Sequence, residues 1–339
     1  MSLKIRNKTG NPGKKRVILT LVLFLGFSMI ITLGIGGGRF RFSEMMSFFH
    51  PTSLSPTERT ILFEIRLPRL ILSVLVGAAL SLSGSVLQGL FQNPLVDPYV
   101  LGISSGGAVG AIIAILSGIS LGFITIPLFS FIFALTTTFL VLHLGRIGHK
   151  FPLEIMLLAG VAIGFFFSAL ISLGMFLSGE NLHQMVFWIM GGFWNSSWKK
   201  VFTLLPLFAI GLPITFSYSR ELNAFLLGEK VAESMGVDVE RTKKILLITT
   251  SLLVAASVSV SGVIGFVGLV VPHIIRITIG EDHRLLLPAS LLLGSSVLLW
   301  ADALSRTILH PVELPVGVIT SLMGAPFFIY LLRRKKKER

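Results

Sequence analysis

The sequence has no cysteine, little charge and no phosphate-binding loop. Zero cysteines in 339 residues exclude disulfide bonds, thiolate metal sites and cysteine nucleophiles. Charged residues make up 13% of the chain, about half of the roughly 25% found in soluble domains. A water-soluble globule of this size needs more polar side chains to cover its surface, so that class is excluded. The motif G-x-x-x-x-G-K-[ST] is absent, so we expect no ATP hydrolysis by the chain itself.

Hydrophobic residues dominate instead, at 53% of the chain with a mean hydropathy of +0.85. The charged residues are bunched, and the apolar stretches between them are long enough to cross a bilayer as helices. The sequence therefore predicts an all-α, polytopic membrane protein. Segmentation at charges, prolines and glycine clusters predicts ten spans, at residues 16–36, 66–91, 95–116, 123–145, 155–178, 200–218, 244–262, 265–280, 285–304 and 314–332.

The basic residues predict how the chain lies in the membrane. The net charge is +13, and basic clusters occupy the tails at 1–16 and 333–339. If ten helices cross with both tails in the cytoplasm, 21 Lys and Arg residues lie inside and 8 outside. This bias agrees with the positive-inside rule. We expect a single transmembrane domain over 1–339, with cytoplasmic tails and a cytoplasmic loop at 219–243.

Three arginines stay at outer helix ends against this bias. Arg66 and Arg69 lie at the start of the second predicted span, and Arg306 follows the ninth. One interpretation is anchoring to lipid headgroups. The other is a docking surface for an acidic partner outside the cytoplasm. The sequence leaves both open.

An internal repeat indicates a transporter architecture. Residues 73–84, SVLVGAALSLSG, align without a gap on residues 251–262, SLLVAASVSVSG, at an offset of 178. Beyond this core, Pro94 aligns with Pro272 and Gly102 with Gly280. The two copies begin at the second and seventh spans, so they cross in opposite directions. Inverted repeats of this kind are typical of transporters, although chance similarity between two Ser/Gly-rich helices is the alternative.

The loop at 219–243 is the most informative polar segment. It contains the amphipathic stretch GEKVAESMGV, in which Ala232 precedes Gly236 by four residues. This spacing places the two on one helical face, and the glycine suits the end of a short helix. Such a surface helix fits docking into a groove of a soluble partner. A solvated helix without a partner is the alternative.

No catalytic or metal-binding constellation emerges from the sequence. The segment GISSG at 102–106 matches the serine-hydrolase pattern. That pattern requires a strand–turn–helix elbow, which an all-helical chain does not provide. The alternative enzyme would be an intramembrane protease that uses Ser104 or Ser105 as nucleophile and His273 or His310 as base. The histidines lack metal-ligand spacing. Ion-coupled carriers need ionisable groups near mid-membrane. The predicted spans place none there. The sequence therefore favours a transporter that is driven by another subunit over an ion-coupled secondary carrier.

Several long segments closely resemble one known family, the FecCD-type permeases of binding-protein-dependent ABC importers for iron chelates, haem and vitamin B12. The resemblance runs in order from about residue 58 to 332. It is carried by RLPRLILSVLVGAALSLSGSVLQGLFQNPLVDPYVLGISSGG (66–107), MLLAGVAIG (156–164), SGVIGFVGLVVPHIIR (261–276), DHRLLLPAS (282–290) and ELPVGVITSLMGAPFFIYLL (313–332).

The resemblance implies a type II importer permease that acts as a homodimer in the bacterial or archaeal cytoplasmic membrane. It implies two ATP-binding cassette subunits inside, which hold ATP and Mg, and a substrate-binding protein outside. The pathway would run between the two copies, lined by the fifth and tenth spans. Iron-siderophore is the first candidate cargo, with haem, cobalamin and molybdate as alternatives.

Site residues follow from the resemblance position by position. It assigns ATPase coupling to Glu229, Ala232, Glu233, Gly236 and Val237, binding-protein docking to Arg66, Arg69 and Arg306, and the cytoplasmic gate to Asn93 and Leu95. The connection at 37–65, with four phenylalanines, departs from any transferable pattern.

Overall fold

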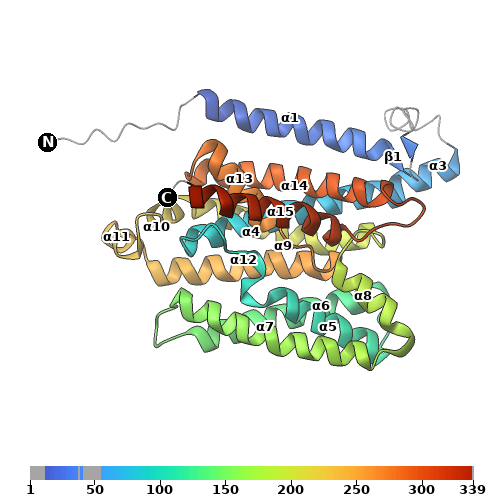
Figure 1. Ribbon diagram of the computed structural model, residues 1–339, viewed down its shortest axis with the longest axis horizontal. Coiled ribbons are helices and arrows are strands. Elements are labelled where there is room, and N and C mark those ends of the chain that lie inside the picture. Colours follow the sequence, from blue (N-terminus) through green and yellow to red (C-terminus); the bar gives the residue numbers. More distant parts are fainter. Residues whose placement is uncertain (1–11, 37–38, 41–54, 338–339) are drawn as a thin grey trace.

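The computed structural model describes residues 12–36, 39–40 and 55–337, which form a bundle of long helices (Figure 1). Within these residues, seven helices are long and apolar enough to cross a membrane, and three apolar helices are shorter. The all-α architecture and the ten predicted spans are thereby confirmed. The ten helices are α1 (Pro12–Gly34), α4 (Leu67–Leu90), α5 (Ile103–Ser117), α6 (Thr125–Gly145), α7 (Leu153–Phe176), α9 (Trp198–Ser217), α12 (Val239–Ser261), α13 (Val267–Ile279), α14 (His283–Thr307) and α15 (Val316–Lys337).

Short elements connect these helices. At one end of the bundle, β1 (Ile35–Gly36) pairs antiparallel with β2 (Arg39–Phe40), and α3 (Pro56–Thr60) continues through a π-helical turn, η3 (Ile61–Arg66), into α4. The other short elements are the 3₁₀ turns η4 (Pro98–Leu101), η5 (Gly122–Ile124) and η6 (Gly179–Asn181), and the helices α8 (Leu182–Met190), α10 (Ser219–Phe225) and α11 (Glu229–Ser234).

The bundle has two distinct ends (Figure 1). α10 and α11 lie at one end, where α1 also begins and α15 ends; α3 and β1 lie at the opposite end. We call these the α11 end and the α3 end. The predicted loop at 219–243 thus forms a compact structure on the α11 end, and part of the connection at 37–65 is helical. The predictions for residues 1–11 and 338–339, and for 37–38 and 41–54 of that connection, concern residues outside the described part of the chain.

Helix α4 is the centre of the bundle. Nearly all of its side chains are buried, and it crosses α14, α12 and α13. Gly77 faces Gly294 of α14, and Gly84 faces Gly268 of α13, so closely that a Cβ on either α4 residue would collide with the opposite backbone. Small residues allow such approach where lipid supplies no hydrophobic drive between helices. By contrast, α1 and α7 are mostly exposed.

The helix packing shows the repeat, but the two copies correspond residue by residue only over the aligned segments 73–84 and 251–262. α4 packs against α14 as α12 packs against α6, which matches an inverted pair of units. Past the core the copies diverge, because α12 ends at Gly262 with a φ of +70°, whereas α4 continues helically through Gly84. Pro94 consequently lies in a turn and Pro272 inside α13. The alignment of these prolines was therefore wrong as a structural equivalence.

One span differs from its predicted bounds, and one helix was not predicted, each for an identifiable reason. The span predicted from residue 95 begins as helix only at Ile103, because Pro98 opens a 3₁₀ turn and Gly102 takes a φ of +74°. The helix α8 was missed altogether: it is too short to cross a membrane and lies between two longer spans.

Candidate functional site

The α3 end is held by an ion cluster formed by Arg69, Asp302, Arg306 and Glu313, which we call the arginine cluster. Arg69 Nε donates to the two carboxylate oxygens of Asp302 at 3.0 and 3.2 Å. Its Nη2 lies 2.9 Å from Oδ1 of Asp302 and 2.9 Å from Oε2 of Glu313. Arg306 Nε lies 3.2 Å from Oδ2 of Asp302. One buried carboxylate therefore lies between two guanidinium groups, and the half-exposed Glu313 balances the second positive charge.

The three predicted outer arginines thus come together, but they are not equally available. Arg69 is only 8% exposed, and its guanidinium is engaged by Asp302 and Glu313. Arg66 and Arg306 are partly exposed, and each also reaches the end of α1: Arg66 donates to the carbonyl of Leu33 at 3.1 Å, and Arg306 to that of Ile35 at 2.6 Å. The cluster therefore ties α1, α4 and α14 to the connection before α15.

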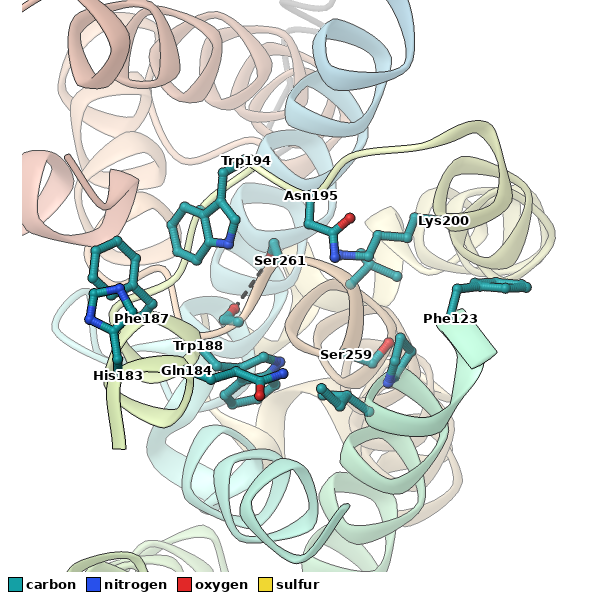
Figure 2. A pocket seen from close by; sticks show the side chains of 15 residues that line it. Phe123, His183, Gln184, Phe187, Trp188, Trp194, Asn195, Lys200, Ser259 and Ser261 are labelled. Atoms are coloured by element: carbon teal, nitrogen blue, oxygen red, sulfur yellow. Dashed lines mark hydrogen bonds between the residues drawn. The ribbon is translucent and has the colours of Figure 1, made fainter. Parts of the chain in front are cut away.

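A cavity of about 450 Å³ opens among α6, α8, α9 and the end of α12 (Figure 2). Its walls are aromatic and polar, with Phe123, Phe187, Trp188, Trp194, His183, Gln184, Asn195 and Lys200 around it. The Phe187 ring contacts His183 at 4.4 Å and Trp194 edge-on at 5.5 Å between centroids. None of the lining residues belongs to α7 or α15.

Beside this cavity the chain is unwound between α12 and α13. Gly262 takes a φ of +70° and Phe266 a φ of +68°. The Tyr99 hydroxyl accepts from the amide of Ile264 at 3.2 Å and donates to its carbonyl at 2.9 Å. The amide of Gly192 donates to Ser261. Because unpaired backbone groups are costly inside a membrane, these contacts stabilise the break. A Cβ on Gly317, at the start of α15, would collide with the carbonyl of Met190 there.

At the α11 end, the residues predicted for coupling surround a short helix with a well-formed C-terminus. The amide of Gly236 donates to Glu233, and that of Val237 to Ala232, which is the Schellman pattern with glycine in the left-handed position. Gly236 therefore ends the helix as predicted. It does not share an exposed face with Ala232, because Ala232 is fully buried and packs inward, whereas Gly236 is exposed.

Three apolar side chains of this segment are exposed, among polar ones such as Lys230 and Glu233. Leu227, Val231 and Met235 recur every four residues and are 62%, 42% and 62% exposed. They project from the α11 end beside the exposed Glu233. Sequence reasoning missed them. Their spacing is not a helical repeat, because Leu227 precedes Gly228, whose φ of +104° separates it from α11.

A buried lysine holds this helix to the bundle. Lys243 on α12 is 2% exposed; its Nζ lies 2.7 Å from Glu229 at the start of α11 and 3.3 Å from Glu240. The other oxygen of Glu240 accepts from the amide of Phe151, just before α7, at 2.7 Å. Lys243 also lies 3.4 Å from the Phe151 carbonyl. A continuous polar chain therefore links α11, through α12, to the beginning of α7.

The predicted gate residues lie in the turn after α4, also at the α11 end. The Asn93 side chain accepts from the amide of Leu95 at 3.0 Å, and both residues are exposed. Gln88 secures the turn, since its amide nitrogen reaches the carbonyls of Val96 at 3.4 Å and Leu269 at 3.1 Å. The turn thus rests on α13.

No group of three or more His, Asp or Glu residues is close enough to hold a metal ion in the part of the chain that was described. Ser105, the alternative nucleophile, donates to the carbonyl of Gly102 on its own helix at 2.9 Å rather than to a histidine.

Comparison with known proteins identifies relatives along almost the whole chain. Residues 22–334 match the FecCD transport family. The cobalamin import system permease protein BtuC of Halobacterium salinarum is 44% identical over 83% of this chain and 75% of its own length. The hemin transport system permease protein HmuU of Yersinia pestis is 40% identical over 94% of this chain and 97% of its own length.

The fold is shared with a solved structure described as an inward-facing conformation of a metal-chelate type ABC transporter. The TM-score is 0.84 at 35% identity, covering 94% of this chain and 99% of the other.

Asp302 and Glu313 allow a test of whether burial sets the contribution of each carboxylate to stability. Asp302→Asn should cost about 3–5 kcal/mol of stability, because it leaves the buried Arg69 and the partly exposed Arg306 without their shared carboxylate. Glu313→Gln should cost about 1 kcal/mol or less, since that side chain is 39% exposed. Unfolding of the purified protein in mixed micelles would measure both. Equal losses would show that burial does not set the strength of the cluster.

Proposed function

Since the chain belongs to the FecCD transport family, we propose that it passes a metal chelate across the cell membrane, with an iron-siderophore as the first candidate. The chain is the multi-pass, non-catalytic permease subunit of an ABC importer, and ATP is used by its partner ATPases. The match over 22–334 carries this conclusion. Relatives named for cobalamin and hemin support a metal-chelate cargo, and haem, cobalamin and molybdate are the alternatives within the same class.

We propose that two copies of the chain form the pathway between their α7 and α15 helices. Both helices carry exposed faces in the single chain, including Phe165 and Phe176 on α7 and Leu322 on α15. The face of α7 also presents the hydroxyl-bearing Ser168 and Ser172. Small polar groups on an otherwise apolar exposed helix suit a hydrated pathway better than lipid. No residue of either helix lines the cavity of Figure 2.

We propose that the α3 end faces the substrate-binding protein and that the α11 end, with both tails, faces the cytoplasm. Lys and Arg are concentrated at the α11 end, in agreement with the positive-inside rule. Arg66 and Arg306 are the partly exposed arginines that an acidic partner would reach. Arg69 contributes indirectly, because it fixes Asp302, which orients Arg306.

We propose that the α11 end docks into the ATPase through Leu227, Val231 and Met235. Their exposure supplies the apolar anchor that a groove on a soluble subunit requires. Ala232, Val237 and Gly236 shape the helix, and Glu229 secures it to Lys243. Movement of α11 would then pass through Glu240 to the start of α7, and so to the pathway. The exposed Asn93–Leu95 turn, beside α13, is placed to close that pathway on the cytoplasmic side.

The function is tested by uptake into liposomes that contain the permease and its ATPase. We expect ATP-dependent accumulation of one cargo when binding protein is supplied with ferric siderophore, haem, cobalamin or molybdate in turn. Uptake driven by an ion gradient without ATP would overturn the importer assignment in favour of a secondary carrier. Uptake of molybdate alone would refute the metal-chelate cargo while leaving the importer intact.

If Arg66 and Arg306 dock the binding protein, replacing them should lower its affinity for the permease, and the loss should depend on salt concentration. Arg66→Glu combined with Arg306→Gln should weaken association at least tenfold at low ionic strength, and the difference should shrink as salt rises, because charge complementarity is screened. Surface plasmon resonance on nanodiscs would measure it. Arg59→Glu is the control: it alters charge on exposed α3, outside the cluster. Unchanged affinity in the double variant would leave lipid anchoring as the role of these arginines.

If the ATPase docks on the exposed apolar residues at the α11 end, a carboxylate introduced at Val231 should weaken its binding. Val231→Asp should weaken ATPase association about tenfold or more, because a carboxylate would be buried unpaired in the groove. Co-purification and ATPase-coupled uptake would both report it. Val312→Asp provides the matched control, since Val312 is similarly exposed but lies before α15 at the α3 end. Normal association of Val231→Asp would show that the ATPase docks elsewhere.

A further inference from the structure

A second cavity, of about 510 Å³, lies at the α11 end between the end of α6 and the beginning of α12. We propose that it binds the phosphate headgroup of an anionic phospholipid. The proposal does not depend on which cargo the permease carries. It rests on the charges around the cavity, on their partners, and on the surface that continues from it along α6.

The cavity is strongly basic. Arg146 follows α6, Arg241 and Lys244 belong to the first turns of α12, and His143 and His149 complete the rim. The one carboxylate in the lining, Glu240, is already engaged by Lys243 and by the amide of Phe151. Within the described part of the chain, Arg146, Arg241 and Lys244 form no ion pair with a carboxylate. Three permanent positive charges therefore face one space that lacks a matching anion.

The Arg146 side chain is held in place by the loop that follows α6. Its Nε donates to the carbonyl of Gly148 at 2.6 Å, its Nη2 lies 3.3 Å from Nδ1 of His149, and its guanidinium lies 5.9 Å from the centre of the Phe151 ring. These contacts leave the exposed guanidinium positioned at the rim rather than free in solvent. A bidentate donor that is already oriented loses little entropy when it binds a phosphate.

The inner wall of the cavity is apolar and opens onto lipid. Phe139, Leu142 and Ile248 line it. Phe139 is 57% exposed, and the outward stripe of α6 continues through Leu140 and Leu144, the latter 56% exposed. Along this stripe the apolar surface ends at the level where the basic groups begin. That order, with cations at the boundary and apolar side chains below, matches a headgroup above its acyl chains and not a soluble anion.

Basic pockets between membrane helices near the cytoplasmic surface are recognised sites for anionic headgroups, and each Lys or Arg there contributes about 1 kcal/mol of attraction. The apolar wall adds contact that glycerol phosphate or inorganic phosphate lacks. We therefore assign the site to a phospholipid with a net negative headgroup, such as phosphatidylglycerol, and not to phosphatidylcholine.

Native mass spectrometry of the purified permease with added phosphatidylglycerol or phosphatidylcholine tests the site. Arg241→Gln with Lys244→Gln should lower phosphatidylglycerol affinity about 25-fold, or roughly fivefold for each charge removed. The matched control is Lys230→Gln with Arg284→Gln, which removes two exposed charges from the same end outside the cavity. All four side chains are exposed, and thermal unfolding would verify that both double variants fold.

The proposal is supported if the cavity variant alone loses phosphatidylglycerol and if phosphatidylcholine binds weakly to every form. It is overturned if both double variants lose equal affinity, which would indicate a diffuse surface potential. It is also overturned if millimolar glycerol 3-phosphate displaces the lipid, since the site would then take a soluble anion. Loss of ATPase association with unchanged lipid binding would assign these cations to the ATPase interface instead. Arg146→Gln tests the same site from outside α12, and it should also lower the affinity for phosphatidylglycerol.

Discussion

The absence of a hydrophobic drive between helices inside a membrane is the constraint on which this bundle depends. In lipid, helices gain from packing only if their backbones approach closely. Helix α4 meets this requirement with Gly77 against α14 and Gly84 against α13. With α4 fixed on two sides, α14 and α13 are set relative to each other, and so are the connections at their ends. The arginine cluster joins α4 to α14, and the Asn93–Leu95 turn follows α4 and packs against α13.

The ion pairs lie mainly at the two ends of this framework, where they join separate elements. At the α3 end, Asp302 joins two arginines from different helices and reaches the connection to α15 through Arg69 and Glu313. At the α11 end, Lys243 plays a similar part between α11 and the approach to α7. The helices joined at the two ends, α15 and α7, are those proposed to line the pathway. Each end of the bundle is thus joined by an ion pair or a hydrogen bond to the beginning of one of these two helices.

Sequence reasoning predicted the ten spans because long apolar runs are dictated by bilayer thickness, and this information is local. It placed the start of α5 too early, since the 3₁₀ turn at Pro98 does not interrupt hydrophobicity. It placed Ala232 and Gly236 on one helical face without finding that Ala232 is buried, because periodicity shows which residues share a face but not which face packs inward. The pairing of Arg69 with Asp302 and the burial of Lys243 arise from tertiary contacts between distant segments, and no pattern in one sequence contains them. The family assignment, by contrast, rested on long motifs and was confirmed.

The ion pair between Arg69 and Asp302 joins residues that are 233 positions apart in the chain. Synthesis at about 5–20 residues per second separates their emergence from the ribosome by roughly ten to fifty seconds. During that interval α4 carries an arginine near its outer end without its carboxylate partner. Until Asp302 and Glu313 have been made, the Arg69 guanidinium depends on water or lipid headgroups, because an unpaired charge is costly in hydrocarbon. The pair can therefore form only after α14 has been synthesised.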